Sequence, residues 1–498
     1  MKERVIGYLK RFNMIYSAII IFLGFAGVEI IFNQLTSASD EVFTFCNIFK
    51  LHNGINLYSE NNVITTPLFF YLGNIFLSLF GTNFFIYKLF GIFIFETVFL
   101  LILNLLKKLK IPTIRGVIYI FLFIIPFSKI LYINGASYNI IAILFWLVGM
   151  NLIIKKDKFE VKVLEQSIVS ALVFASKQNI GIYYLMALTI FTIYNYKKDK
   201  KQMLKKLFAT YFEFALITAT WCIALAIQGQ FIDFINYCFL GLGEFTYHIS
   251  ASWITLLPYV IPVLAILGLV IVKKVCHISN ENKIMKTSYF FFSFMIPSLL
   301  IGYPIFNYYH VDLAVLISIV YCMYIAEQFI IRFPEVFSKV IVKVIVIIYM
   351  SIILALNIFY ICRYILMITS DEYKFNFNDP YYGLSVSDEW ETRIKNIVNF
   401  VKDKEKDNKD VVIFSADSTI YQLILKGNYQ DFDLPFIGNW GYNGEERVLN
   451  KIKELKNTYI LTKYDDITTQ ESTKIKDYIK ENYEKTGEIE GFDIYYIE

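Results

Sequence analysis

The chain lacks the short motifs that mark several common classes of protein. Its six cysteines form no CxxC pair and no spacing typical of a metal centre, and most stand in apolar runs, where a thiol packs as a small hydrophobic group. A glycine-rich phosphate loop is missing from the C-terminal region, so we expect no nucleotide or redox cofactor. The net charge of +4 is small for 498 residues and gives no sign of a nucleic-acid partner.

Apolar residues dominate instead. The chain is 56% hydrophobic and 18% aromatic, and its mean hydropathy is positive. A soluble domain of this composition would expose large apolar patches, so the composition predicts a polytopic α-helical membrane protein. A membrane span needs roughly 20 apolar residues. We predict eleven spans, at residues 14–35, 83–106, 115–133, 138–154, 163–177, 179–195, 207–228, 253–272, 287–303, 311–331 and 343–365.

Short basic loops predict the orientation of these spans. Lysine and arginine gather at residues 107–110, 155–158, 196–206, 273–286 and 332–343. Loops of this kind lie on the cytoplasmic side by the positive-inside rule. The basic N-terminus is then cytoplasmic as well, and the first apolar run is a retained span because it is too long for the core of a signal peptide. An odd number of spans places the C-terminal region outside the cytoplasm.

The apolar run at 65–81 does not fit this alternation. Counting it as a span would put the lysines at 107–110 outside and invert every later loop. We therefore predict a helix in the external membrane interface, started by Pro67 and ended by Gly81, within a first external loop at 36–82. A crossing at 65–81 is the alternative.

The composition changes near residue 366, which divides the chain into a transmembrane domain at 1–365 and an extracytoplasmic domain at 366–498. Apolar strand-like runs alternate with amphipathic helical patterns in the second domain, which predicts a small α/β fold. The strand candidates are 411–414, 458–462 and 492–497, and the helix candidates are 390–402, 445–455 and 470–483.

Two adjacent carboxylates, Asp40 and Glu41, follow the first span directly. Acidic residues at the end of a membrane helix serve either to solvate that end or to perform chemistry at the membrane surface. An external carboxylate can act as a general base that takes a proton from an attacking hydroxyl. Glu41 could position Asp40, raise its pKa by like-charge repulsion, or bind the acceptor.

Two lysines near the predicted outer ends of spans could hold an anionic leaving group. Lys88 lies just inside the second span, where an unpaired ammonium is costly. Lys177 stands in a polar turn with Gln178 and Asn179, between two short apolar runs. The plainer interpretation of both lysines is that they extend to the lipid headgroups.

Two further clusters are candidates for binding. The external turn at 303–312 gathers aromatic, amide, imidazole and carboxylate groups, including Tyr309 and His310. In the loop at 229–252, Glu244 and His248 are four residues apart, so on a helix they would share a face suited to a metal. This spacing alone is a weak signal, and the sequence requires no metal.

The membrane half resembles the GT-C class of polyprenyl-phosphate-sugar-dependent glycosyltransferases, which includes the protein O-mannosyltransferases and the lipid A aminoarabinose transferases. The resemblance is clearest in the first third of the chain. It rests on Asp40-Glu41, the turn at 54–58, the run at 66–71 that leads to Leu79-Phe80-Gly81, Lys88, and the later segments 134–139, 177–181 and 307–310.

The resemblance implies an inverting transfer of a hexose or pentose from a polyprenyl-phosphate donor to an acceptor hydroxyl outside the cytoplasm of a bacterial cell envelope. Asp40 would be the base, and Glu41 its neighbour in the catalytic pair. The donor phosphate would be bound by Lys88, Lys177, Gln178 and Asn179, and the substrates by Tyr138, Asn139, Tyr309 and His310.

Other functions remain alternatives at this point. The acceptor would be a glycan, a lipid or a protein, and a divalent metal is compatible with the chemistry without being required. A glycan polymerase or ligase of the cell envelope would use the same donors, although its large external loops usually lie mid-chain. A transporter or lipid flippase would place charged groups near the bilayer midplane, where Glu96 is the main acidic candidate.

Overall fold

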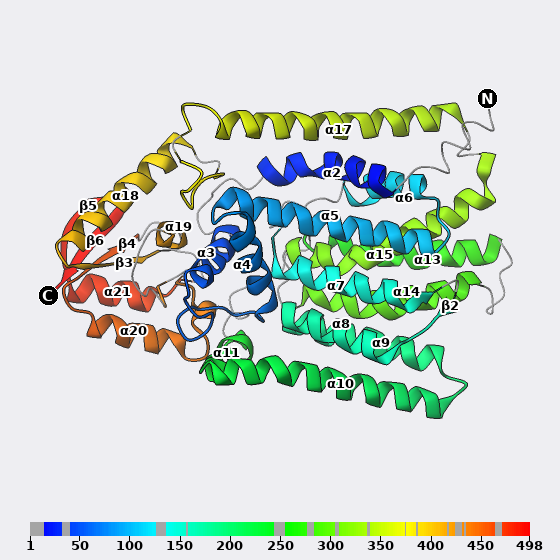
Figure 1. Cartoon of the computed structure of the whole chain (residues 1–498), viewed down its shortest axis with the longest axis horizontal. Coiled ribbons are helices and arrows are strands. Elements are labelled where there is room, and N and C mark those ends of the chain that lie inside the picture. Colours follow the sequence, from blue (N-terminus) through cyan, green and yellow to red (C-terminus); the bar gives the residue numbers. More distant parts are fainter. Residues whose placement is uncertain are drawn as a thin grey trace. The chain divides into compact units, whose positions relative to one another are not determined.

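The computed structural model is mostly helical, and Figure 1 follows it from the N-terminus in blue to the C-terminus in red. Its elements group into two compact units. Unit 1 consists of Met1–Phe32, Phe90–Ala219 and Ser250–Tyr373, and unit 2 of Asn33–Leu89, Thr220–Ile249 and Lys374–Glu498. The structure describes residues 14–31, 40–125, 136–155, 158–243, 254–275, 283–303, 308–335, 339–373, 375–384, 387–415, 418–423, 431–432, 435–463 and 471–498.

Unit 1 is built from helices, two of which, α5 and α10, also extend into unit 2. Each of the eleven predicted apolar segments overlaps helical structure within the residues that the structure describes. The elements are α2 (Met14–Ile31), α5 (Phe84–Lys108), α6 (Thr113–Tyr119) with the π-helical turn η1 (Ile120–Ile124), α7 (Tyr138–Ile153), the short β1 (Ile154–Lys155) and β2 (Lys158–Phe159), α8 (Val163–Ser176), α9 (Gln178–Asn195), α10 (Lys200–Ile227), η4 (Leu257–Tyr259), α13 (Val260–Val275), α14 (Lys283–Ser298), η5 (Leu299–Gly302), α15 (Tyr308–Arg332) and α17 (Val340–Ile368).

The length of these helices fits a polytopic membrane protein. Among the described residues, six helical segments are long and apolar enough to cross a bilayer, and further apolar helices are shorter. The six are Phe84–Lys108, Lys200–Ile227, Leu257–Val275, Lys283–Gly302, His310–Arg332 and Val340–Ile368. The predicted count of eleven spans and the predicted sidedness stay predictions.

An amide side chain ties the first helix of unit 1 to the last. Asn357 of α17 donates from Nδ2 to the Gly24 carbonyl (2.7 Å) and accepts at Oδ1 from the Val28 amide (3.0 Å). Gly24 and Val28 are four residues apart on α2, so the amide bridges a donor and an acceptor of the helix's own ladder. The two backbones approach closely, because a Cβ on Gly27 would lie 2.0 Å from the Asn357 carbonyl oxygen.

Unit 2 combines a four-stranded sheet with several helices, of which α3 and α4 belong to the predicted first external loop. Strand β3 pairs parallel with β4, and β6 pairs antiparallel with both β4 and β5, in the order β3-β4-β6-β5. Its elements are α3 (Asp40–His52), α4 (Leu68–Phe80), α11 (Phe231–Ile235), the π-helical η3 (Asn236–Leu240), α18 (Asp388–Lys406), β3 (Asp410–Phe414), α19 (Ser418–Gln422), η6 (Ile437–Trp440), α20 (Gly444–Glu454), β4 (Thr458–Thr462), α21 (Thr473–Asn482), β5 (Glu484–Ile489) and β6 (Phe492–Ile497).

The sheet carries helices on both faces. Apolar residues of α20 and α21 form one buried core with alternate residues of β3, β4 and β6, including Val412, Ile460 and Tyr495. Neighbouring strand residues point to the opposite face, where the ring of Tyr459 meets Phe400 of α18 at 5.8 Å. Figure 1 shows α18 on one side of the strands and α20 and α21 on the other. This layered arrangement confirms the predicted small α/β fold, while its extracytoplasmic location stays a prediction.

Several element boundaries match their sequence signals. Helix α4 begins directly after Pro67 and ends at Gly81, whose φ of 125° suits glycine, so the predicted bounds of this helix are confirmed. Strands β4 and β6 have the predicted ends. Strand β5 was not predicted, because its exposed sequence lacks an apolar alternation. The predicted division at residue 365 follows the change in composition. By compactness, the C-terminal residues 374–498 form one unit with residues 33–89 and 220–249.

Candidate functional site

The two predicted acidic residues open helix α3. Asp40 is its first residue, and its side chain lies outside the described part of the structure. Glu41 is buried, and its Oε1 lies 2.6 Å from Nζ of Lys88 on α5, with 4% and 2% of the two side chains exposed. The Lys88 ammonium also lies 5.5 Å from the centre of the Phe84 ring. Lys88 thus has a carboxylate partner within the protein, and its predicted contact with a donor phosphate stays a prediction.

An aromatic seam holds α3 against the start of α5 next to this ion pair. The Phe45 ring lies 5.4 Å from Phe84 and 5.3 Å from Tyr87, centre to centre, and all three side chains are buried. Burying large aromatic side chains is strongly favourable, and edge-to-face contacts add to it. The ion pair therefore stands beside a packed aromatic junction between α3 and α5.

The segment 375–384, which we call the connector, caps the start of α5. The Phe84 and Phe85 amides donate to the carbonyls of Pro380 (3.0 Å) and Tyr382 (2.8 Å). Asn83 donates to the carbonyl of Phe377 at 2.7 Å. The first amides of a helix have no partner within it, so the connector satisfies groups that would otherwise need water. The chain entering the C-terminal domain is thereby bound to the helix that carries Lys88.

A second cluster, in unit 1, brings together three predicted site residues. Nζ of Lys177 lies 3.5 Å from Nε2 of His310 and 4.7 Å from the centre of the Tyr138 ring. Tyr138 is the first residue of α7, Lys177 precedes α9, and His310 is in the first turn of α15. Three helix N-termini therefore meet around one ammonium group. Helix N-termini and lysine both attract anions, so this cluster is chemically suited to phosphate.

The remaining predicted residues have the following positions. Asn139 is buried at the start of α7, and its Oδ1 has no hydrogen-bond partner among the described residues. Gln178 is buried in the first turn of α9, and Oδ1 of Asn179 accepts from the Ile180 amide at 2.9 Å. Tyr309 lies in the first turn of α15, with its side chain outside the described part. Their predicted binding roles stay predictions.

The weak metal candidates, Glu244 and His248, both lie outside the described residues. Within the described ranges, no group of three or more His, Cys, Asp and Glu side chains is arranged to hold a metal ion. The structure therefore neither supports nor tests the predicted metal pair.

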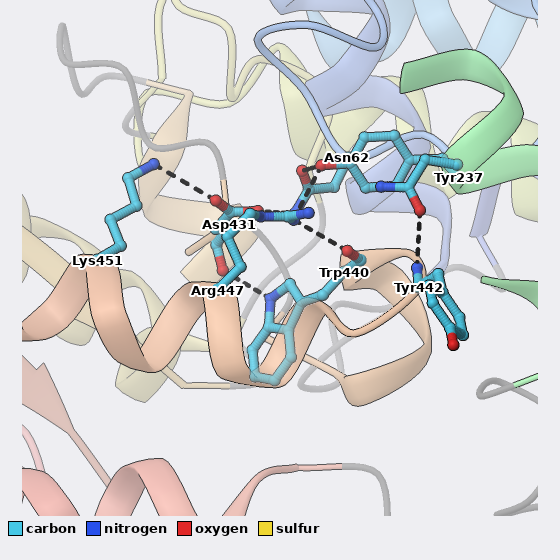
Figure 2. A network of polar contacts seen from close by, with 8 residues as sticks. Asn62, Tyr237, Asp431, Trp440, Tyr442, Arg447 and Lys451 are labelled. Carbon is cyan, nitrogen blue, oxygen red and sulfur yellow. Dashed lines mark hydrogen bonds and ion pairs between the residues drawn. The ribbon is translucent and has the colours of Figure 1, made fainter. Parts of the chain in front are cut away.

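A polar network centred on Asp431 contains residues that the sequence did not single out (Figure 2). Oδ1 of Asp431 accepts from Arg447 (2.6 Å) and from Asn62 (3.2 Å). Burial lowers the pKa of the Arg447 guanidinium, but the interactions with Asp431 and Tyr237 together outweigh this effect and the pKa is raised. These residues are far apart in the sequence and share no motif, so no local signal announces the network.

The loop between α3 and α4 is also packed through buried polar groups. The Tyr58 hydroxyl donates to the Thr65 carbonyl at 2.9 Å. Burial, with a further contribution from Cys238, raises the pKa of the Tyr58 phenol well above its usual value. The phenol therefore stays neutral and keeps its proton for this hydrogen bond, which closes the loop on itself.

Comparison with known proteins gives distant structural likenesses but no match in sequence. No protein-family model matches the chain, and no curated protein does. Among solved structures, the chain is similar to the oligosaccharyltransferase of Archaeoglobus fulgidus, with a TM-score of 0.46 and 12% identity, over 90% of this chain and 67% of that one. A likeness this distant assigns no function, so the function rests on the residues of the chain itself.

Proposed function

We propose that this chain is an inverting membrane glycosyltransferase that moves a sugar from a polyprenyl-phosphate donor to an acceptor hydroxyl outside the cytoplasm. The proposal includes a cytoplasmic N-terminus, an extracytoplasmic C-terminal domain and a glycan, lipid or protein acceptor. Asp40 is the general base, and no nucleotide or redox cofactor takes part.

The buried ion pair between Glu41 and Lys88 carries this proposal. Either of two adjacent carboxylates could serve as the general base. Glu41, however, has a cation 2.6 Å away within the protein, the ammonium of Lys88. A charge-assisted contact of this kind fixes the carboxylate in place, so we assign Glu41 a positioning role. We therefore assign the role of general base to Asp40, at the first position of the same helix.

The reaction follows from these roles. The acceptor hydroxyl gives its proton to the Asp40 carboxylate while its oxygen forms a bond to the anomeric carbon. The bond from that carbon to the donor phosphate breaks, its electron pair leaves with the phosphate, and attack from the opposite face inverts the configuration. The leaving phosphate gains negative charge, which the Lys177 cluster is suited to stabilise, since it combines an ammonium with three helix N-termini.

A paired assay of donor turnover tests the proposal. Purified wild-type protein and Asp40→Asn are each given radiolabelled polyprenyl-phosphate sugars and a crude envelope fraction as acceptor. We expect transfer by the wild type and a loss of about a hundredfold or more in the variant, as for removal of a general base. Persistent transfer by a folded Asp40→Asn protein would contradict the assignment of Asp40. Absence of transfer from every donor would contradict the proposed reaction.

One observation favours transport as the second candidate. Glu96 lies well inside α5, and both of its carboxylate oxygens are buried without a hydrogen-bond partner among the described residues. An acidic group in a membrane-spanning helix often marks a transport path. Glu96→Gln therefore serves as the matched control: transferase activity should survive this change, whereas a transporter would lose lipid or solute movement.

A further inference from the structure

Asp431 is the hub of the network in Figure 2. Its carboxylate accepts from Arg447 at 2.6 Å and from Nδ2 of Asn62 at 3.2 Å, and lies 3.5 Å from Nζ of Lys451. Its backbone carbonyl accepts from Nε1 of Trp440 at 2.7 Å. Only 5% of the carboxylate side chain is exposed. Charge-assisted hydrogen bonds of this length are among the stronger contacts in a protein, so the hub is rigid.

The network joins three segments that are far apart in the sequence. Asn62 belongs to the loop after α3, Tyr237 to η3, and Arg447 to α20 of the C-terminal domain. The Tyr237 hydroxyl donates to Oδ1 of Asn62 at 2.9 Å and accepts from Arg447 at 3.1 Å. Asn62, Tyr237 and Arg447 therefore each contact at least two other members of the network, and the loss of one loosens contacts between all three segments.

The backbone at Asp431 adopts a conformation that needs support. Its φ is 75°, in the left-handed region that few residues other than glycine occupy, although aspartate and asparagine do so more often than most. Such residues persist where their surroundings impose the conformation, and they gather at functional positions. The contacts of Asp431 on both its carboxylate and its carbonyl supply that constraint.

A short path of contacts leads from the hub to helix α3. Asn62, held by Asp431, follows Asn61 directly, and Asn61 is fully buried. Oδ1 of Asn61 accepts from Nζ of Lys50, a buried lysine on the last turn of α3, at 3.3 Å. The loop that contains Asn61 is closed by the Tyr58 hydroxyl. The C-terminal domain thus reaches the helix that begins with Asp40 through two side-chain hydrogen bonds joined by the Asn61–Asn62 backbone.

We propose that Asp431 is a positioning residue for the catalytic helix: through Asn62, Asn61 and Lys50 it fixes α3 and so the place of its first residue, Asp40. This inference rests on the proposed function, because it assumes that Asp40 is the base. It gives the C-terminal domain a part in turnover in addition to any contact with the acceptor. A general base must reach the proton it removes, and a misplacement of about 1 Å can cost on the order of a hundredfold in rate.

Steady-state kinetics with three variants of the full-length protein test the proposal. Asp431→Asn keeps the size of the side chain and tolerates the positive φ, but removes the charge that binds Arg447. Asn62→Ala removes the next contact in the path. Lys485→Met is the matched control. It deletes a cation that is paired at 2.6 Å with Asp493 in the same domain, and this pair is not part of the path from Asp431 to α3.

We expect Asp431→Asn and Asn62→Ala each to lower kcat about tenfold to a hundredfold, with the donor KM within about threefold of wild type. The double variant should lose little more than either single variant, because both act along one path. Lys485→Met should leave both constants unchanged. Equal kcat in wild type and Asp431→Asn, or losses that multiply in the double variant, would overturn the proposal.

Hydrogen–deuterium exchange separates positioning from general destabilisation. In Asp431→Asn we expect faster exchange in peptides covering 40–67, with β3, β4 and β6 still protected. Faster exchange throughout the C-terminal sheet, with loss of donor binding, would overturn the proposal by making Asp431 a residue of domain stability alone. Exchange needs no turnover, so it also distinguishes the two ideas. Local loosening at 40–67 in Asp431→Asn, together with no sugar transfer by the wild type, would count against the proposed function and not against the contact path.

Discussion

The strongest stability prediction concerns the ion pair between Glu41 and Lys88. Replacing Lys88 by Met keeps most of the apolar stem but leaves the Glu41 carboxylate buried without its cation. At 2.6 Å and an effective dielectric constant of about 20, the attraction between the two charges is about 6 kcal/mol. Desolvation of both groups offsets much of this, so removing one partner should cost about 3–5 kcal/mol of unfolding free energy.

The double variant Glu41→Gln/Lys88→Met provides the decisive comparison. With both charges removed, no buried ion is left unpaired, so its loss should be well below the sum of the two single losses. Denaturant unfolding of the purified protein in detergent micelles, followed by tryptophan fluorescence, measures all four proteins. Lys406→Met, which breaks an exposed ion pair on α18, is the control and should unfold like wild type. Strict additivity of the Glu41 and Lys88 losses would refute the reasoning.

Three further predictions concern other parts of the chain. Lys177→Met should raise the donor KM about tenfold or more, because a charge-assisted contact to phosphate contributes about 1.5–3 kcal/mol; an unchanged KM would place the phosphate elsewhere. Gly27→Ala should lower the melting temperature, since its methyl group would lie 2.0 Å from the Asn357 carbonyl oxygen, whereas Gly243→Ala meets nothing within 4 Å and should not. Ser472→Ala removes the N-cap of α21 and should cost about 1 kcal/mol in denaturant unfolding; no loss would mean that water replaces the cap.

Local sequence signals were sufficient for most of the helices and strands. Long apolar runs can be buried only as regular structure, and Pro67 and Gly81 mark the ends of α4 because one lacks an amide donor and the other tolerates positive φ. Strand β5 was missed because it lies at the edge of the sheet and its sequence does not alternate between apolar and polar side chains. An edge strand is defined by its partner, in this case β6, more than by its own composition.

The candidate site was predicted as separate residues rather than as contacts. An ammonium at Lys88 is costly in an apolar helix, which indicates that it needs a partner, but nothing local identifies Glu41 as that partner. Lys177 and His310 were likewise chosen for separate reasons and lie 3.5 Å apart. Asp431 and Asn62 are joined only by the tertiary fold, which no periodicity or spacing records.

The position of β6 in the sheet has a consequence for biosynthesis. The strand that the ribosome makes last of the four is an interior one, bonded to β4 on one side and to β5 on the other. Strands β3 and β4 can pair as they emerge, but β5 has its sheet partner only once Phe492–Ile497 has been made. The four-stranded sheet can therefore close only after β6 has been made, and removal of this one strand should leave β5 unfolded along with it.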